Sequence, residues 1–377
     1  MEKIALFTFL KSYNYGTLFQ AYALSRVITK LGRECEYIDF VKCAESKGIR
    51  HLASKIKKKL ANVFATKKNE GIDDFSFWKS DIFKQVAKKC DDFRISFIPQ
   101  SLQYTPSTIR STNRIYERFI VGSDQTWSPN IIDSSSPFLL GFVEDARKKY
   151  SYAPSLGTIS IPDTFKDVLR NSLSSFSLLS CRERTNCESL SKLLRREVSY
   201  VLDPTLLLDK NEWLEISLPY KNLPERFVLC YILGEKDCIS RFAEELGAFN
   251  GLPVIYIMTR PYYLSKKNVL TDVGPREFLT ILSKAAYLVT DSFHGTVFSV
   301  NFSIPFFTFT KRENSDTSKD NDRIKEILSE FNLLSRFCKD NAVLQNADSK
   351  MSFEFAQFKL TELRETSLSF LRKVINE

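Results

Sequence analysis

Short apolar runs alternate with segments of helical periodicity along most of this chain. The first run, Lys3–Phe9, contains β-branched and aromatic residues and predicts a buried parallel strand. After a polar loop, apolar residues recur at spacings of three and four as far as Leu31, which predicts a helix that ends at Gly32. A second strand is expected at Cys35–Phe40. This β-loop-α-β unit is typical of the start of a doubly wound sheet.

The alternation resumes after about residue 92 and continues to the end of the chain. In the first half, strands are predicted at Arg118–Gly122, Lys149–Ala153, Phe176–Cys181 and Ser199–Leu202, with helices from Asp163 and over Glu183–Arg195. In the second half, strands are predicted at Phe227–Leu233, Pro253–Met258, Tyr287–Thr290 and Ile304–Thr308, with helices from Asp237, over Pro275–Ala285, from about Thr296 and over Phe353–Asn376.

A polar segment with two prolines, Pro219–Arg226, is typical of a linker between two domains. We therefore expect an α/β fold with two Rossmann-like domains and a cleft between them, in a glycosyltransferase-B-like arrangement. The predicted domains are residues 1–218 and 225–345, and a C-terminal helix within residues 350–377 is expected to pack back onto them.

The pattern is interrupted over about residues 45–92, where positive charge is concentrated. The chain has 54 Lys and Arg against 45 Asp and Glu, a net charge of +9. Lys47–Lys68 contains many of these basic residues and no acidic one, and its apolar residues recur at helical spacing. An ordinary solvated helix face and a helix lying on an anionic membrane surface both fit this pattern. We expect no nucleic-acid partner, since no recognised motif accompanies it.

Composition limits the chemistry that remains. The 377 residues are 43% hydrophobic, which suits a globular core and excludes disorder. With only His51 and His294 present, a His-rich metal centre is excluded, and His51 falls in the basic helix. Eight cysteines without C-x-x-C spacing indicate free thiols in a reducing compartment. A cytoplasmic protein is expected, with residues 47–68 able to bring it to the inner face of the membrane.

Four polar loops follow predicted strands, where ligands of open α/β sheets bind. Asn14-Tyr15-Gly16-Thr17 opens the first helix, and Gly16 lets a ligand approach the backbone. Ser123-Asp124-Gln125, with Trp127 nearby, suits hydrogen bonding and stacking with a sugar. An ordinary turn and a core tryptophan are the structural alternatives for these two loops.

The other two loops suit an anionic ligand. Arg182 follows a strand, and its guanidinium can form a bidentate contact with a carboxylate or phosphate of a ligand. It can also form a salt bridge with Glu183. His294-Gly295-Thr296 begins a helix whose amides can hold an anion, although a lone histidine is often structural. The spacing Asp320-Asn321-Asp322 is found in metal-dependent glycosyltransferases, but it lacks flanking strands, so no metal and no cofactor is expected.

Taken together, these loops and their order resemble the polysaccharide pyruvyl transferase family. The segments that carry the resemblance are Asn14–Leu24, Val121–Trp127, Ser151–Gly157, Cys181-Arg182-Glu183, Asp203–Leu207 and Thr290–Thr296. The resemblance implies transfer of the carboxyvinyl carbons of phosphoenolpyruvate to two hydroxyls of a saccharide, lipid-linked or polymeric, that is destined for the cell envelope or capsule. It assigns the acceptor to the first domain and the donor to the second.

The resemblance also implies roles for single residues. His294 would be catalytic, and Arg182, Gly295, Thr296 and Arg323 would bind the donor. Some family members carry Arg two residues before this His, where Ser292 stands here, so Lys311 and Arg312 are further candidates for the donor's counter-charge. A nucleotide-sugar glycosyltransferase and an inactive saccharide-binding relative remain alternatives.

Overall fold

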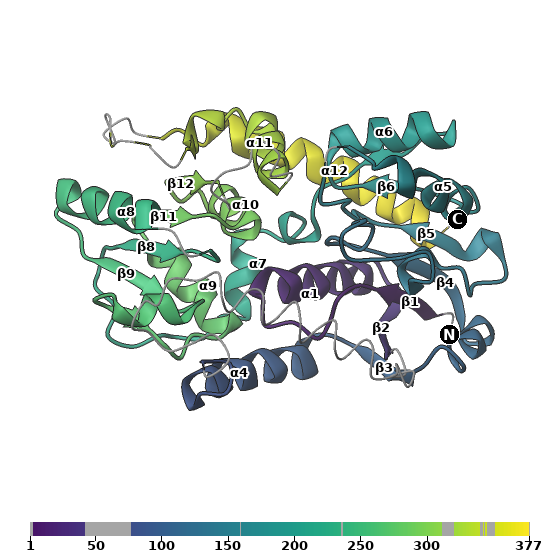
Figure 1. The fold of residues 1–377 in the computed structure, drawn as a ribbon, viewed down its shortest axis with the longest axis horizontal. Coiled ribbons are helices and arrows are strands. Elements are labelled where there is room, and N and C mark those ends of the chain that lie inside the picture. The colour runs from purple at the N-terminus through teal and green to yellow at the C-terminus, as the bar shows by residue number, and fades with distance from the viewer. Residues whose placement is uncertain are drawn as a thin grey trace.

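The computed structural model describes residues 3–41, 77–158, 160–234, 237–310, 320–339, 342, 344 and 351–376 (Figure 1). The basic helix expected at residues 47–68 lies outside these ranges. The described chain forms two parallel sheets, each flanked by helices, in two halves that lie side by side. The predicted α/β fold with two Rossmann-like domains is therefore confirmed.

The N-terminal sheet has the strand order β3-β2-β1-β4-β5, and all its paired strands are parallel. Its strands are β1 (Lys3–Phe7), β2 (Glu34–Phe40), β3 (Gln100–Tyr104), β4 (Tyr116–Val121) and β5 (Lys149–Ser151). The short pair β6 (Ser180–Cys181) and β7 (Ser199–Tyr200) lies next to β5, since Tyr150 forms a bridge with Leu178. The helices of this half are α1 (Tyr15–Lys30), α4 (Asp81–Phe97), α5 (Asp163–Leu173) and α6 (Arg184–Leu194).

The C-terminal sheet has the order β10-β9-β8-β11-β12-β13, again with parallel pairs. Its strands are β8 (Val228–Tyr231), β9 (Val254–Ile257), β10 (Val269–Leu270), β11 (Tyr287–Thr290), β12 (Phe306–Phe309) and β13 (Phe337–Cys338). The helices are α8 (Asp237–Asn250), α9 (Pro275–Lys284), α10 (Phe293–Phe302) and α11 (Asp320–Glu330). Between the halves lie the 3₁₀ turn η4 (Pro204–Leu206) and α7 (Lys210–Glu215).

Several segments differ from the sequence-based expectation. Residues 81–97 form helix α4, where a polar insertion was expected up to about residue 92. Helix α10 begins at Phe293 rather than near Thr296, so His294 lies in its first turn. The Asp320-Asn321-Asp322 segment begins helix α11 instead of lying in a loop. Among the described residues, no cluster of three or more His, Cys, Asp or Glu could hold a metal ion.

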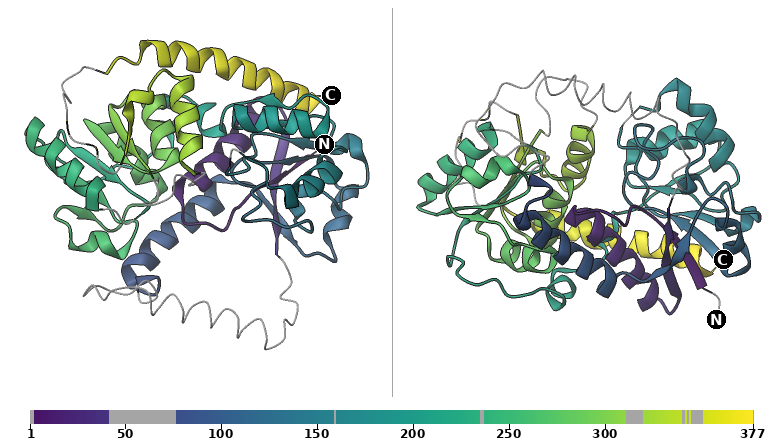
Figure 2. Two further views of the ribbon diagram at one scale, coloured as in Figure 1. Left: turned by 45° about the horizontal axis from the view of Figure 1, so that its top comes forward. Right: turned by 60° about the horizontal axis from the view of Figure 1, so that its bottom comes forward.

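One hydrophobic core runs through both halves. Trp213 of α7 is fully buried, and its ring contacts Phe19 of α1 at 5.2 Å and Phe298 of α10 at 5.0 Å between centroids. The last helix, α12 (Glu354–Asn376), then crosses from the C-terminal half to the N-terminal half (Figure 2). The two sheets are thereby held in a fixed relation, with their facing loops forming the site described below.

No helix in the described part of the chain is both long enough and apolar enough to cross a membrane.

Candidate active site

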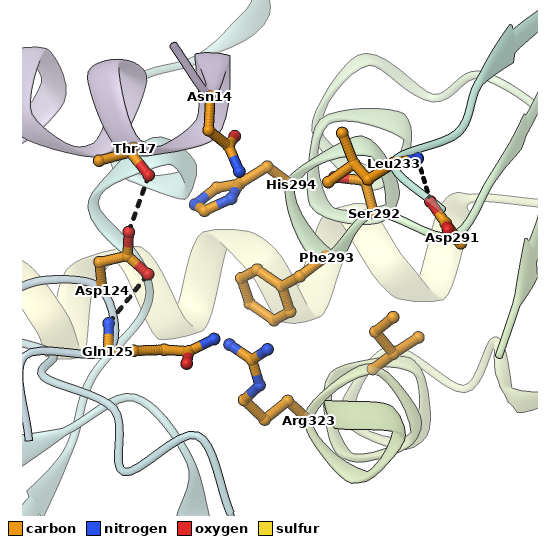
Figure 3. A pocket seen from close by; sticks show the side chains of 11 residues that line it. Asn14, Thr17, Asp124, Gln125, Leu233, Asp291, Ser292, Phe293, His294 and Arg323 are labelled. Carbon is orange, nitrogen blue, oxygen red and sulfur yellow. Dashed lines mark hydrogen bonds between the residues drawn. The ribbon is translucent and has the colours of Figure 1, made fainter. Parts of the chain in front are cut away.

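The site lies where the strand order reverses in both sheets. Strand β1 lies inside the N-terminal sheet and β8 inside the C-terminal sheet, and each has a neighbouring strand on both sides. The chain leaves these neighbouring strands in opposite directions, so the loops at their carboxyl ends diverge and leave space for a ligand. A pocket forms where these loops from the two halves meet (Figure 3). It is lined by Asn14, Thr17, Asp124, Gln125, Leu233, Asp291, Ser292, Phe293, His294, Arg323 and Ile324.

His294 projects from the first turn of α10 toward the first turn of α1, in the other half (Figure 3). The contact is close because Gly16 has no side chain. A Cβ at Gly16 would lie 2.0 Å from Nδ1 and 2.2 Å from Cγ of His294. Gly16 is therefore a glycine because an imidazole from the other half fills the space that a side chain would need.

The Nε2 atom of His294 faces the carboxylate of Asp203 at 3.8 Å. Asp203 is 1% exposed and also accepts hydrogen bonds from Arg182 Nη1 at 2.8 Å and Thr205 Oγ1 at 2.7 Å. Burial alone would raise the pKa of this carboxyl, but the nearby His294 imidazole, the Arg182 guanidinium and the hydrogen bond from Thr205 hold its pKa well below the ordinary range. Asp203 is thus a carboxylate that can balance a positive charge on the imidazole.

Asp203 was not among the predicted site residues, although the segment Asp203–Leu207 carried part of the family resemblance. Its signal in the sequence is an acidic residue directly after a predicted strand and before a proline. That pattern also describes an ordinary cap, which Asp203 provides by accepting from the Thr205 amide at 3.0 Å. Only the fold reveals that the second carboxylate oxygen faces His294.

The expectation that Gly295 and Thr296 offer their amides to an anion is not supported by the hydrogen bonds. Ser292 is the N-cap of α10, and its hydroxyl accepts from the Gly295 amide at 3.2 Å. Its carbonyl accepts from the Thr296 amide at 3.0 Å. Both residues are buried, and Gly295 allows close packing, since a Cβ there would lie 2.7 Å from Thr290 Oγ1. Their amides belong to the helix cap.

Polar groups from both halves meet on the far side of Phe293. Arg323 of α11 points at Gln125, whose amide oxygen, in its favoured orientation, accepts from Nη1 at 3.0 Å and Nη2 at 2.9 Å (Figure 3). Next to it, Asp124 accepts from Thr17 Oγ1 at 3.0 Å. The pocket thus offers a guanidinium at one side and a carboxylate at the other.

Besides Gly16, three predicted acceptor residues do not line this pocket. Trp127 is fully buried, donates from Nε1 to the Phe138 carbonyl at 3.1 Å, and belongs to the N-terminal core, so the expected sugar stacking is not supported. Tyr15 is 5% exposed and donates to the Val273 carbonyl. Ser123 is buried and donates to the Ala153 carbonyl at 2.8 Å.

Arg182 lies beneath the pocket instead of in its wall. It is 4% exposed, pairs with Asp203, and its Nε donates to Glu183 at 3.2 Å, which was the structural alternative. Its guanidinium lies 4.3 Å from the ring of Phe293, and Nη2 has no hydrogen-bond partner among the described residues. Arg182 therefore positions Asp203 and keeps one buried donor unused.

Comparison with known proteins agrees with the resemblance of these loops. The sequence model of the polysaccharide pyruvyl transferase family matches residues 14–311, which is most of the chain and covers the strands from β2 to β12. Arg323 and Ile324 lie beyond the matched range. No curated protein gives a match to the chain.

Several solved structures are similar in overall fold at very low sequence identity. The UDP-GlcNAc 2-epimerase of Neisseria meningitidis, solved with UDP-GlcNAc, is 9% identical over 98% of this chain and 100% of its own, with a TM-score of 0.47. A glycosyltransferase of Rickettsia africae is 7% identical over 100% and 99% of the two chains, with a TM-score of 0.47. A Streptomyces glycosyltransferase is 10% identical over the whole of both chains, with a TM-score of 0.44.

Proposed function

The chain belongs to the polysaccharide pyruvyl transferase family, and on this premise we propose that it transfers the pyruvyl carbons of phosphoenolpyruvate to a saccharide of the cell envelope, forming a pyruvate ketal. The observation that carries this proposal is the His294 imidazole, which lines the pocket and faces the buried Asp203 carboxylate at 3.8 Å. An imidazole held in this way suits a step in which one proton must reach a carbon atom of a bound substrate.

The donor carries a carboxylate and a phosphate, so its site needs positive charge. Arg323 supplies it at the pocket wall, where its two terminal nitrogens contact the Gln125 amide oxygen at 3.0 and 2.9 Å. A carboxylate or phosphate oxygen pair would replace that amide oxygen and match the fork of the guanidinium. The unused Nη2 of Arg182 is a second candidate, once the ring of Phe293 moves.

Protonated His294 gives its proton to the methylene carbon of the donor, which becomes a methyl group and leaves the adjacent carbon electrophilic. A sugar hydroxyl bonds to this carbon, and the carbon–oxygen bond to phosphate breaks. A second hydroxyl then closes the ketal. Of the two hydroxyl protons released, one restores His294 and the other leaves with phosphate.

The acceptor would bind on the N-terminal side of the pocket. Asn14, Thr17 and Gln125 present an amide, a hydroxyl and a second amide there. The Asp124 carboxylate, which accepts from Thr17 at 3.0 Å, is the group placed to take up the hydroxyl proton that then leaves with phosphate.

Phosphate release with phosphoenolpyruvate and a panel of envelope saccharides tests the proposal, followed by the mass of the product. We expect His294→Ala to lower turnover by about 10²–10⁴-fold, the usual contribution of a general acid. His51→Ala, which removes the other histidine of the chain, is the matched control and should keep its turnover.

Two results would overturn the proposed function. Transfer from a nucleotide sugar, without phosphate release from phosphoenolpyruvate, would assign the chain to glycosyl transfer. Saccharide binding without turnover of any donor would assign it to binding alone.

A further inference from the structure

A half-exposed aromatic cluster lies beside the pocket and is not used by the reaction described above. Tyr13 is 48% exposed and Trp78 is 41% exposed. The ring of Phe83 contacts both edge to face, with centroids 5.3 Å from Tyr13 and 4.5 Å from Trp78. Phe77 is 1% exposed and contacts Trp78 at 5.2 Å. The two exposed rings therefore rest on an aromatic base that limits their movement.

The cluster is connected to the pocket on two sides. Tyr13 directly precedes Asn14, which lines the pocket. On the other side, the guanidinium of Arg260 lies 5.8 Å from the Trp78 ring, and its Nε donates to the Leu233 carbonyl at 3.1 Å. Leu233 also lines the pocket. Since Asn14 comes from the N-terminal half and Leu233 from the C-terminal half, the cluster borders the pocket where the halves meet.

We propose that Tyr13 and Trp78 form an aromatic surface that binds the saccharide units next to the one held in the pocket. This inference rests on the proposed function. An aromatic face is apolar and carries partial negative charge, so it suits the C–H face of a sugar ring, while the phenol and indole N–H meet hydroxyls. The Arg260 guanidinium adds donors at the edge of the same surface. Grouped and exposed aromatic side chains are typical of binding surfaces.

A polysaccharide acceptor is long enough to reach this aromatic surface from the pocket. The unit that is modified would lie in the pocket, and a polysaccharide continues from that unit on at least one side. The neighbouring units must then lie against the wall of the opening, where Tyr13 and Trp78 are exposed. The aromatic surface would therefore favour long acceptors over single sugars.

An anionic membrane is the other ligand that exposed aromatic rings beside a cationic side chain can meet. The connection to the pocket through Asn14 and Leu233 favours the saccharide, because a membrane needs no contact with a catalytic pocket. Vesicles of phosphatidylcholine with phosphatidylglycerol separate the two ligands experimentally.

Trp78 is itself the reporter for the test. The other two tryptophans, Trp127 and Trp213, are fully buried, so the quenching of fluorescence by acrylamide reports on Trp78. We expect the saccharide that supports phosphate release to shield Trp78 from acrylamide. If no saccharide supports phosphate release, the ligands tested are a fixed panel of glucose, galactose, mannose and N-acetylglucosamine oligomers, from dimers to hexamers. Shielding should increase with chain length and disappear in Trp78→Phe.

Variants test whether the aromatic side chains themselves bind the saccharide. Tyr13→Ala should weaken oligosaccharide binding about three- to tenfold, the effect of losing one aromatic contact. Phe249→Ala is the matched control, because this phenylalanine is 57% exposed on α8, outside the cluster. It should leave the binding constant unchanged, and equal weakening by both variants would overturn the proposal.

The remaining outcomes separate this inference from the proposed function. Shielding of Trp78 by a saccharide, without phosphate release from phosphoenolpyruvate, would keep the aromatic surface and refute the transferase. The opposite result is phosphate release with Trp78 unshielded and with equal KM for short and long acceptors, both in Tyr13→Ala and in the parent protein. It would keep the transferase and refute the aromatic surface. Shielding by vesicles alone would assign the surface to a membrane and overturn the saccharide.

Discussion

Gly16 leaves the space that the His294 imidazole fills, so a single methyl group can test the position of the ring. A Cβ at Gly16 would lie 2.0 Å from Nδ1, and the ring would have to move. We predict that Gly16→Ala lowers kcat by about 10²–10⁴-fold, as the loss of a general acid does. The variant should stay folded, because Ala is a better helix former than Gly and Gly16 lies within α1.

Measurement of kcat and Tm checks this prediction. Gly141→Ala is the matched control, because a Cβ at Gly141 meets no atom within 4 Å. If Gly16→Ala were folded and had the kcat of the parent protein, the imidazole would not need its observed position.

Asp203 makes the stability of the fold depend on pH. Its pKa is lowered in the fold, so the unfolded chain, with an ordinary carboxyl pKa of about 3.9, binds this proton more readily. The carboxylate therefore stabilises the fold above about pH 4, and this contribution is lost as the pH falls further. Asp203→Asn lacks it and removes one charged partner of the buried Arg182, whose Nε still donates to Glu183.

We predict that Asp203→Asn lowers the free energy of unfolding by about 3–5 kcal/mol at neutral pH, as removal of one member of a buried ion pair does. The difference from the parent protein should narrow between about pH 5 and pH 3. Urea unfolding at each pH measures it, and a difference that stays constant over this range would contradict the role of the charge.

At the scale of single residues, the sequence predicted those that stand in the loops after strands. Five of them, Asn14, Thr17, Asp124, Gln125 and His294, line the pocket, and Arg323, which the family resemblance indicated, lines it from α11. Trp127 was misplaced because a tryptophan after a strand can face a ligand or the core, and only packing decides. Asp203 and Phe293 were missed because their positions depend on Arg182, which is distant from both in sequence.

At the scale of elements, the buried parallel strands were easiest to predict, because each is a short apolar run between turn signals. Helix α4 was missed because only Val86, Cys90 and Phe93 of its 17 residues are buried, a narrow stripe in a polar segment. Helix α10 has the opposite composition: nine of its ten residues are buried. With no polar face there is no periodicity to show where it begins, and the Ser292 cap is the only signal.

The cap of α10 holds the helix that carries His294, so we predict a cost for removing it. Ser292→Ala should lower the free energy of unfolding by about 1 kcal/mol, since the Gly295 amide loses its side-chain acceptor. Ser292→Asp keeps an acceptor at the cap and should recover most of this loss. Thermal and urea unfolding of the two variants measure the effect, and equal stability of both would show that the cap is not what stabilises this turn.

At the scale of the whole molecule, α12 connects the two halves a second time. Gln357, near its start, donates to the Val300 carbonyl of α10 at 2.6 Å. In its second half, Ser367 accepts from the Leu202 amide at 2.9 Å, and the Val374 carbonyl accepts from Arg118 at 3.2 Å. Its amphipathic pattern predicted a helix over these residues. The surface that it covers depends on long-range contacts that periodicity does not contain.

This path of α12 has a consequence for how the protein is made. Leu371, Val374 and Ile375 are fully buried in the core that also contains Ile4 and Tyr152, and Phe370 contacts Tyr152 at 6.4 Å between centroids. Strand β1 and the last turn of α12 therefore complete the same hydrophobic core. During synthesis, the N-terminal half leaves the ribosome before α12 does, so part of its apolar surface stays uncovered until α12 has been translated.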